Sequence, residues 1–325
     1  MSRSLLPLLA DGKFHSGQGL AGALGVSRTA VWKQVNRLVT DSVLEIESVK
    51  GKGYRIRGGI DLLDIDQVKA ALDARASALM THLEILDTVD STNAHAMRLA
   101  EQGCLTGLVC TAEQQSAGRG RRGRSWVSPY ASNLYVSLLW NFTQGAAALE
   151  GLSLAVGVAV ARALQACDVP HVGLKWPNDV LYDGAKLGGI LLEMKGDAAG
   201  NCGVVIGVGL NVAMPAAAAG AIDQAWTDIK TITNNQHPKR SRILAALLNE
   251  LLPLVADFEQ QGFTHWREEW QSLDAFCNAP VVLHAGDVPL GGIARGVDAR
   301  GALQLETATG LQSIYGGEIS LRAAS

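Results

Sequence analysis

The stretch GQGLAGALGVSRTAVWKQVNRLV, residues 17–39, predicts a helix-turn-helix. Gly25 separates two short helical patterns, and glycine readily takes the positive φ that such a turn requires. Ser27 is a typical N-cap for the second helix. After it, apolar residues recur at the spacing of one helix face: Val31, Val35 and Leu38. The polar residues of the second helix are therefore expected to face outward.

The next segment, VLEIESVKGKGYRIR at 43–57, reads as a strand, a turn and a second strand, which completes a winged helix over 1–60. Residues 1–60 hold nine Lys and Arg against four acidic residues, a net charge of +5, which leaves −8 for 61–325. This asymmetry indicates a polyanionic partner. A domain used only for protein contacts is the alternative. The candidate DNA-binding residues are Ser27, Arg28, Thr29, Lys33, Arg37, Lys50 and Lys52.

Composition favours a globular protein of several domains: 325 residues, 48% of them hydrophobic and 18% charged. The five cysteines are scattered without a C-x-x-C pair, which argues against a disulfide framework and against a zinc site. The first apolar run is too short for a signal peptide, and the apolar stretch at 151–166 contains Arg162. We therefore predict a cytoplasmic protein without membrane contact.

Strand and helix patterns mix between residues 61 and 277, which predicts an α+β domain with a mainly antiparallel sheet and helices on one side. Strands are predicted within 82–93, 105–114, 133–142 and 201–212, a hairpin about Asp183-Gly184 within 173–197, and helices at 94–103, 151–167 and 240–261. From 278 to 325, five short strands with a turn every eight to ten residues predict a small β-barrel.

The loop QQSAGRGRRGRSWVSP, residues 114–129, contains the pattern G-x-G-x-x-G and four arginines. A dinucleotide fingerprint needs a helix that begins within the glycines, and here the chain runs into Pro129 without helical periodicity. No P-loop or kinase motif accompanies the pattern. We interpret the loop as an anion-binding segment, mobile without ligand because its unpaired arginines repel one another. A solvated basic loop is the alternative.

Two further segments carry polar chemistry. In KWPNDVLYDGAKLGG, Lys175 and Lys186 stand on either side of a hairpin, which could bring both to one end of it near a developing phosphate charge. In DSTN, residues 90–93, the short polar side chains suit hydrogen bonds to a neutral head group. The same residues also suit a helix N-cap.

The order DSTN, QQSAGRGRRGRSW, KWPND with Lys186, and GVGLNV at 207–212 resembles the biotin protein ligases. The preceding GVSRTAVWKQVNRL and GKGYRI are similar to the class that is both biotin ligase and biotin operon repressor. This resemblance implies a central mixed sheet of the class II synthetase type and an SH3-like barrel at the C-terminus. It implies formation of biotinyl-5'-AMP from biotin and ATP, with Mg²⁺ expected, and transfer of biotin to a lysine of a biotin carboxyl carrier protein domain.

The resemblance also assigns roles to residues. It implies catalytic roles for Lys186, Arg119 and Arg121, and adenylate-binding roles for Asn178, Asn211 and Trp226. The residues that it implies for biotin are Ser91, Thr92, Asn93, Gln115, Arg119, Gly120, Arg121, Trp126 and Lys186. It further implies a homodimer when adenylate is bound, and operator DNA as a second partner.

The sequence departs from the family's pattern at AMPAAAAGA, residues 213–221, where the segment expected to cover adenine is rich in alanine and is predicted to be a mobile loop. Two other functions are the alternatives: a lipoate-type ligase on the same catalytic architecture, which GRGRRGR and KWPND disfavour, and a catalytically silent transcription regulator that senses an adenylated metabolite.

Overall fold

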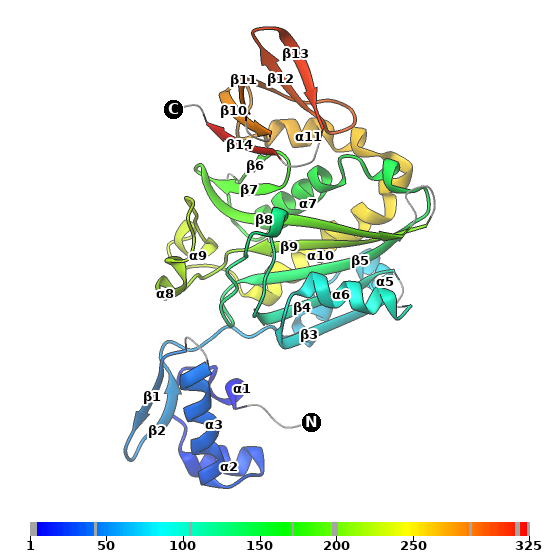
Figure 1. Ribbon diagram of the computed structural model, residues 1–325. Coiled ribbons are helices and arrows are strands. Elements are labelled where there is room, and N and C mark those ends of the chain that lie inside the picture. Colours follow the sequence, from blue (N-terminus) through cyan, green and yellow to red (C-terminus); the bar gives the residue numbers. More distant parts are fainter. Residues whose placement is uncertain are drawn as a thin grey trace.

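The computed structural model describes residues 5–41, 44–103, 106–170, 172–196, 201–285, 288–315 and 319–323. Three sheets follow one another along the chain: a two-stranded wing, a seven-stranded central sheet and a five-stranded C-terminal sheet. Figure 1 shows the N-terminal elements at one end of the molecule and the C-terminal sheet at the other, with the central sheet between them.

The N-terminal elements form the predicted winged helix. They are α1 (Leu6–Leu9), α2 (Gly17–Leu24), α3 (Arg28–Asp41), β1 (Ile46–Val49) and β2 (Gly53–Ile56). Gly25 has the positive φ of 69° that the turn between α2 and α3 needs. Ser27 caps α3, because its Oγ accepts a hydrogen bond of 3.1 Å from the amide of Ala30. Val31 and Val35 are buried in the core of this domain, as their spacing predicts.

The central sheet has the strand order β3-β4-β5-β9-β8-β7-β6, in which β3 and β4 are parallel and all other neighbours are antiparallel. Its strands are β3 (His82–Val89), β4 (Leu108–Gln115), β5 (Leu134–Phe142), β6 (Gly173–Lys175), β7 (Asp179–Tyr182), β8 (Ala185–Gly196) and β9 (Cys202–Leu210). The predicted hairpin is confirmed: Asp183 and Gly184 both have positive φ, 50° and 75°, in the two-residue turn between β7 and β8.

Helices cover both faces of this sheet, so the prediction of helices on one side is wrong. The helices of the first face are α7 (Leu152–Ala166) and α10 (Arg240–Gln261), which pack on residues such as Val109 and Leu138. The helix of the other face is α6 (Thr92–Glu101), which packs on Cys110, Leu139 and Val205. Strands covered on both faces read as near-continuous apolar runs rather than alternating ones, and β5 and β9 are such runs, so the sequence did carry a signal for two covered faces.

The remaining helices are short: α4 (Ile65–Ala70), α5 (Ala74–Leu79), α8 (Ala216–Ala219), α9 (Ile229–Ile232) and α11 (Arg267–Ser272). Within the expected loop at 213–221 the structure has one helical turn, α8, because a run of alanines after Pro215 favours a helix. Among the described residues, no helix combines the length and hydropathy needed to cross a bilayer.

A buried ion pair ties the segment between winged helix and central sheet to the core. The Arg240 side chain, 1% exposed, pairs with Glu113 and donates to the carbonyl oxygens of Asp61 and Asn133. Glu113 in turn accepts a 2.7 Å hydrogen bond from the amide of Leu63. The two charges therefore fix the chain at 61–63, where it leaves the winged helix.

The C-terminal strands form an antiparallel sheet with the order β13-β12-β11-β10-β14. Their bounds are β10 (Pro280–Ala285), β11 (Val288–Val297), β12 (Leu303–Thr307), β13 (Gly310–Ile314) and β14 (Ile319–Ala323). The five predicted strands are confirmed. Trp176 joins this part to the central sheet, since its Nε1 donates to the carbonyl oxygen of Gly301 at 3.0 Å.

Candidate active site

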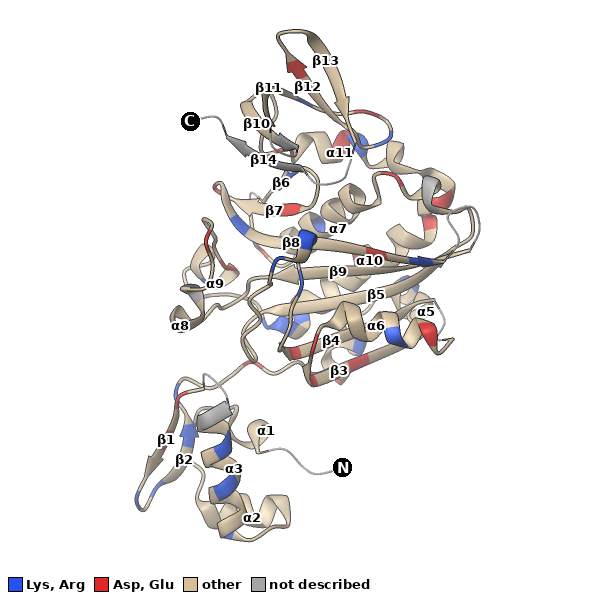
Figure 2. Ribbon diagram, viewed as in Figure 1, with Lys and Arg blue, Asp and Glu red and all other residues tan. Residues whose placement is uncertain are grey.

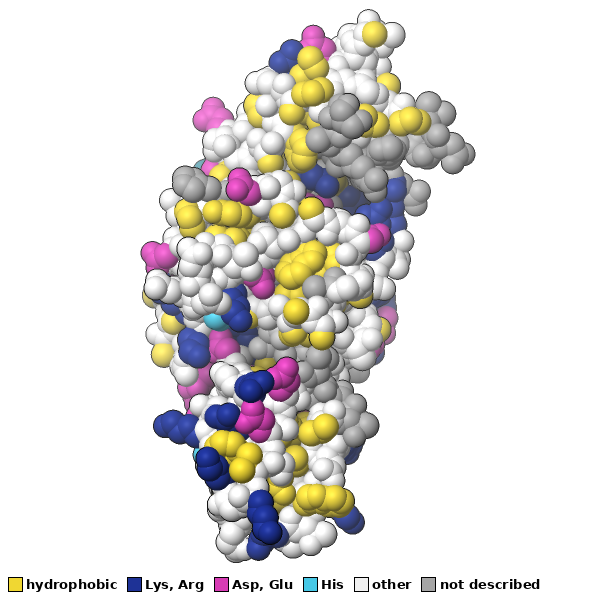
Figure 3. All heavy atoms as spheres, turned by 90° about the vertical axis from the view of Figure 1, so that its left-hand side faces the viewer, with side chains coloured by type: hydrophobic (Ala, Val, Ile, Leu, Met, Phe, Trp, Pro, Cys, Tyr) yellow, Lys and Arg dark blue, Asp and Glu magenta, His cyan; other side chains and the backbone are white. Residues whose placement is uncertain are grey.

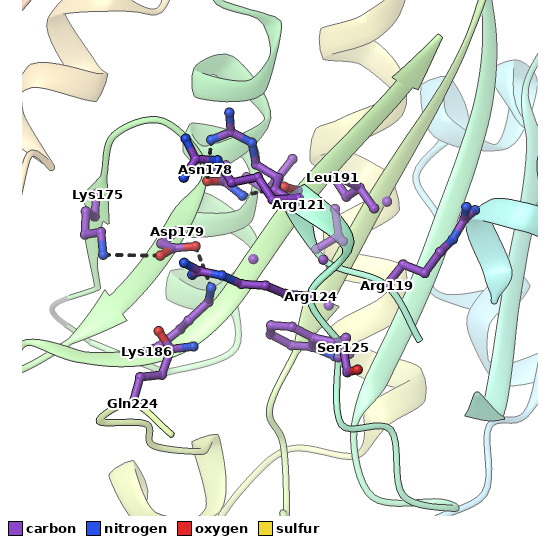
Figure 4. A pocket seen from close by; sticks show the side chains of 18 of the residues that line it. Arg119, Arg121, Arg124, Ser125, Lys175, Asn178, Asp179, Lys186, Leu191 and Gln224 are labelled. Carbon is purple, nitrogen blue, oxygen red and sulfur yellow. Dashed lines mark hydrogen bonds and ion pairs between the residues drawn. The ribbon is translucent and has the colours of Figure 1, made fainter. Parts of the chain in front are cut away.

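A cavity of about 500 Å³ opens between the arginine-glycine loop and the strands β8 and β9 (Figure 4). Its volume is in the range of sites that bind small organic molecules. Among its lining residues are most of those that the sequence singled out: Ser91, Thr92, Asn93, Gln115, Arg119, Gly120, Arg121, Trp126, Lys175, Asn178 and Lys186.

One end of the cavity is lined by neutral polar groups. The Oε1 of Gln115 accepts hydrogen bonds from the amide and hydroxyl of Thr92, at 2.9 and 3.2 Å. Ser137 Oγ lies 2.8 Å from Thr92 Oγ1 and 2.6 Å from Asn93 Oδ1. Ser91 is the N-cap of α6, which confirms the N-cap interpretation of DSTN, and it also lines the cavity, where its contact with a head group stays a prediction. This end suits a ligand that offers neutral donors and acceptors.

Glycines make room for these side chains. A Cβ on Gly207 would lie 2.3 Å from Asn93 Oδ1, and one on Gly209 would lie 2.7 Å from the Trp126 ring. Only glycine therefore lets β9 pass so close beneath the pocket. Trp126 forms an apolar wall there, and its buried Nε1 has no hydrogen-bond acceptor among the described residues.

The middle of the cavity is cationic. Lys175 and Lys186 both pair with Asp179, at 3.4 and 2.7 Å, so the hairpin does bring both lysines together. Lys186 Nζ also lies 5.6 Å from the centroid of the Trp126 ring. Asp179 belongs to KWPND, but its role as the shared partner could not be read from spacing.

The arginines of the loop diverge, and the expectation that all four are unpaired is wrong. Arg119 pairs with Glu193 at 3.2 Å, and Arg121 donates to Asn178 Oδ1 at 3.3 Å. In Figure 4, Arg119 points away from Arg121 and Arg124. Burial, with the charge of Arg122 as a second cause, lowers the pKa of the Arg121 guanidinium. Its cationic form is thus desolvated beside the cavity, where an anion binds most strongly.

Glu193 is a residue that sequence reasoning missed. Its Oε2 accepts hydrogen bonds from Asn93 Nδ2 at 2.9 Å and from Arg119 Nη2 at 3.2 Å. The Asn93 amide group also reaches the carbonyl oxygen of Leu191 at 3.2 Å. These acceptors fix the orientation of the amide, so that its oxygen faces Ser137. Glu193 therefore positions both a neutral and a cationic group of the cavity.

We expect Glu193→Gln to raise KM for the ligand of the neutral end about tenfold, with kcat nearly unchanged, because a charge-assisted hydrogen bond is replaced by a neutral one. Steady-state kinetics at varied concentrations of that ligand measure KM and kcat separately. Glu101→Gln is the matched control, since Glu101 pairs with exposed Lys195 away from the cavity. An unchanged KM for Glu193→Gln would remove Glu193 from this role.

A second cavity of about 250 Å³ adjoins the first and shares with it Arg124, Ser125, Trp126, Lys186, Asp223 and Gln224. Its further lining includes Asn211, Met214 and Trp226. Asn211 is 4% exposed, and its Nδ2 donates to the carbonyl oxygen of Thr227 at 3.1 Å. It therefore also holds the chain in place directly after Trp226. Asn178 does not line this second cavity; it lies in the first, where its Nδ2 donates to the carbonyl oxygen of Ile190.

The candidate DNA-binding residues lie on one part of the winged helix. Ser27, Arg28, Thr29, Lys33, Arg37, Lys50 and Lys52 are all exposed. Figure 2 shows Lys and Arg along α3 and at the tip of the wing. Lys52 Nζ lies 5.7 Å from the centroid of the Phe14 ring, which holds the wing against the helices.

The structure describes four of the five cysteines. Cys110, Cys167, Cys202 and Cys277 are thiols, whereas Cys104 lies outside the described residues. Cys110, His95 and Glu84 nevertheless bring three donor atoms within 4.8 Å of one another, beside α6 and outside the first cavity. The absence of a C-x-x-C pair therefore did not exclude a cluster built from three separate elements.

The chain joins a basic winged helix to a sheet with two adjoining cavities that contain cationic side chains. These features define a class of protein in which a domain of the DNA-binding type is fused to a catalytic domain for an anionic ligand. The Biotin/lipoate A/B protein ligase family matches residues 86–211, the Biotin protein ligase C terminal domain matches 276–322, and an HTH domain matches 2–55. The chain belongs to the biotin protein ligases, in the branch of bifunctional ligase/repressor proteins.

Two bifunctional relatives match almost the whole chain, and a solved structure matches three quarters of it. The chain is 40% identical over 321 residues to "Bifunctional ligase/repressor BirA" of Escherichia coli (strain K12), which covers 98% of this chain and 97% of that protein. It is 30% identical over 315 residues to the protein of that name in Bacillus subtilis (strain 168), covering 96% and 95%. A solved structure, "Biotin protein ligase from Aquifex aeolicus in complex with biotin and ATP", is similar with a TM-score of 0.64 and 29% identity, covering 75% of this chain and 100% of that one.

Proposed function

We propose that this chain forms biotinyl-5'-AMP from biotin and ATP and transfers biotin to a lysine of a biotin carrier protein. The observation that carries the proposal is the junction of the two cavities at Lys186 and Trp126. Neutral hydrogen-bonding groups lie at one end, cations in the middle and a second cavity at the other end. This order matches the ureido ring, the carboxylate with the α-phosphate, and the adenosine of the intermediate.

In the first step, a carboxylate oxygen of biotin attacks the α-phosphorus of ATP, and pyrophosphate leaves with the electrons of the broken bond. Negative charge grows on the phosphoryl oxygens, and Lys186 with Arg121 is placed to stabilise it. The desolvated setting of Arg121 strengthens this interaction. Ser91, Thr92, Asn93 and Gln115 hold the ureido ring, Trp126 packs on the apolar part of biotin, and Asn211 and Trp226 face the nucleotide.

In the second step, the amine of the acceptor lysine attacks the carbonyl carbon of the mixed anhydride, an amide forms and AMP leaves. The nucleophile belongs to the acceptor, so the enzyme needs none of its own. The arginine-glycine loop covers the cavity and limits access of water to the anhydride. Arg119, held by Glu193 in this structure, is free to turn to the ligand once a phosphate competes for it.

Mg²⁺, when bound, would neutralise part of the charge of the triphosphate. The carboxylates that line the first cavity include Asp179 and Asp223, and Asp223 also lines the second. Asp179 is already paired with two lysines. Asp223 therefore fits a magnesium ligand better, in keeping with the few protein carboxylates that Mg²⁺ uses beside phosphate oxygens.

The regulatory half of the proposal is that the adenylate-bound chain forms a homodimer and binds operator DNA through its winged helix in the cytoplasm. The exposed cations on α3 and the wing support it, as do the names of the relatives. We further propose functional units at 1–60, 61–277 and 278–325, a class II synthetase-like arrangement for the second and an SH3-like barrel for the third.

The first experiment is the intact mass of a biotin-acceptor domain after incubation with the full chain, biotin and ATP. A gain of one biotin that requires ATP supports the ligase. Lipoate in place of biotin tests the lipoate-type alternative, which requires a gain with lipoate. No gain with either, in a protein that binds biotin, would favour the silent regulator.

Arg121→Gly should release biotinyl-5'-AMP about 10- to 100-fold faster, because a charge-assisted contact to the phosphate is lost. Dissociation of the radiolabelled adenylate measures the rate. Arg122→Gly is the control, since Arg122 is exposed and has a φ of 57° that glycine adopts without strain. Equal rates for wild type and Arg121→Gly would exclude Arg121 from adenylate retention.

A further inference from the structure

Trp32 is an exposed tryptophan in the helix that follows the turn of the helix-turn-helix. Its relative exposure is 54%, although the neighbouring Val31 is fully buried and Val35 is 3% exposed. Tryptophan is highly buried on average, so an indole as exposed as this one is available for contact with a partner. Trp32 therefore presents an indole on the side of α3 that faces away from the domain core.

The surroundings of Trp32 are polar and cationic. Arg28 and Asn36 stand one turn before and one turn after it, on the same face, and Lys33 follows it directly. All three are exposed, and residues 1–60 carry a net charge of +5. Figure 3, in which the left-hand side of Figure 1 faces the viewer, shows blue and yellow side chains next to each other in the lower, N-terminal part of the molecule. This charge selects a polyanion as the partner of the face.

Duplex DNA offers few apolar groups to a side chain in the major groove, and the C5-methyl group of thymine is the main one. In a helix-turn-helix, residues in the N-terminal half of the second helix reach the base edges. Trp32 lies four residues into α3, about 6 Å along the axis from its first residue. Trp32 thus lies in the part of the helix that reaches base edges. Arg28 and Lys33 beside it can contact the DNA backbone.

We propose that Trp32 reads the C5-methyl group of a thymine in each half of the bound duplex and thereby determines sequence specificity. The inference rests on the proposed DNA binding and adds the chemistry of one base position to it. Arg28, Lys33 and the wing lysines contribute phosphate contacts that do not distinguish sequences.

The probe is a duplex selected from a random library by the full chain in the presence of biotin and ATP. In that duplex each thymine is replaced in turn by deoxyuridine, which lacks only the methyl group. Fluorescence anisotropy at fixed salt gives Kd. For the wild type, replacement of one particular thymine in each half of the duplex should weaken binding about fourfold, which corresponds to the burial of one methyl group. Trp32→Ala should bind the selected duplex more weakly and should bind its thymine and deoxyuridine forms equally, as a double-mutant cycle requires.

The controls separate this inference from the proposal beneath it. Failure of the wild type to select or bind any duplex contradicts the DNA-binding proposal itself. Sequence-selective binding in which Trp32→Ala keeps the full deoxyuridine effect overturns the role of Trp32 alone. Val39→Ala removes another exposed apolar side chain, about 10 Å further along α3, and should retain the effect. A change in oligomeric state of Trp32→Ala, with its sequence preference intact, would instead assign the indole to a protein contact.

Discussion

Lys186→Ala should lower the rate of biotinyl-5'-AMP formation by about 100- to 1000-fold, the usual effect of removing one group that stabilises transition-state charge. Lys186 stands where the two cavities meet, with its Nζ 2.7 Å from Asp179 and over the Trp126 ring. The positive charge of Lys186 stabilises the transition state more than the bound substrates, because the phosphoryl oxygens become more negative there. The loss of rate should therefore appear in the chemical step. Single-turnover formation of the adenylate, followed by quench and chromatography, measures it.

Lys175→Ala is the matched control, because Lys175 shares Asp179 but does not line the second cavity. It should lose far less activity than Lys186→Ala. Biotin binding by calorimetry, without ATP, shows whether the Lys186 variant keeps an intact neutral end. If that variant binds biotin and still forms adenylate within threefold of the wild-type rate, the assignment of Lys186 to the chemical step is wrong.

Arg240→Ala should reduce the free energy of unfolding by about 3–5 kcal/mol, because it leaves Glu113 as a buried charge without its partner. For a chain of this size, that loss corresponds to a fall in Tm of roughly 10 °C. Burial already raises the pKa of Glu113, and the charge of Arg240 opposes that shift. Thermal unfolding followed by circular dichroism measures the change.

The carboxyl of Glu113 also determines how the stability of Arg240→Ala depends on pH. Without Arg240 the pKa of Glu113 in the folded state rises further above its unfolded value, so the folded variant favours the protonated form. Its deficit relative to wild type should be small at and below the ordinary pKa of a glutamate and should grow as pH rises through the raised folded pKa. Adding Glu113→Gln should recover part of the loss at neutral pH, since no buried charge remains.

Arg242→Ala, which breaks an exposed pair with Asp168, should stay within about 1 kcal/mol of wild type. Equal Tm values for Arg240→Ala and Arg242→Ala would contradict the account.

Local patterns in the sequence determined the winged helix, the Asp183-Gly184 hairpin and the chemical character of the site. Each depends on local features of the chain, because periodicity, a cap or a turn residue has the same meaning in any fold. The motifs also named the polar, cationic and apolar groups that line the first cavity. They could not give the partners of these groups.

The tertiary structure alone decided which charges meet. Arg119 and Glu193 are 74 residues apart, and Arg240 and Glu113 are 127 apart. They come together because β9 inserts between β5 and β8 in the sheet and because α10 returns across it. Strand order and the face that a helix covers depend on the packing of the whole core, and local preference does not encode them. For that reason the sequence identified most of the groups that line the first cavity, whereas the fold determined how Asp179 and Glu193 position them.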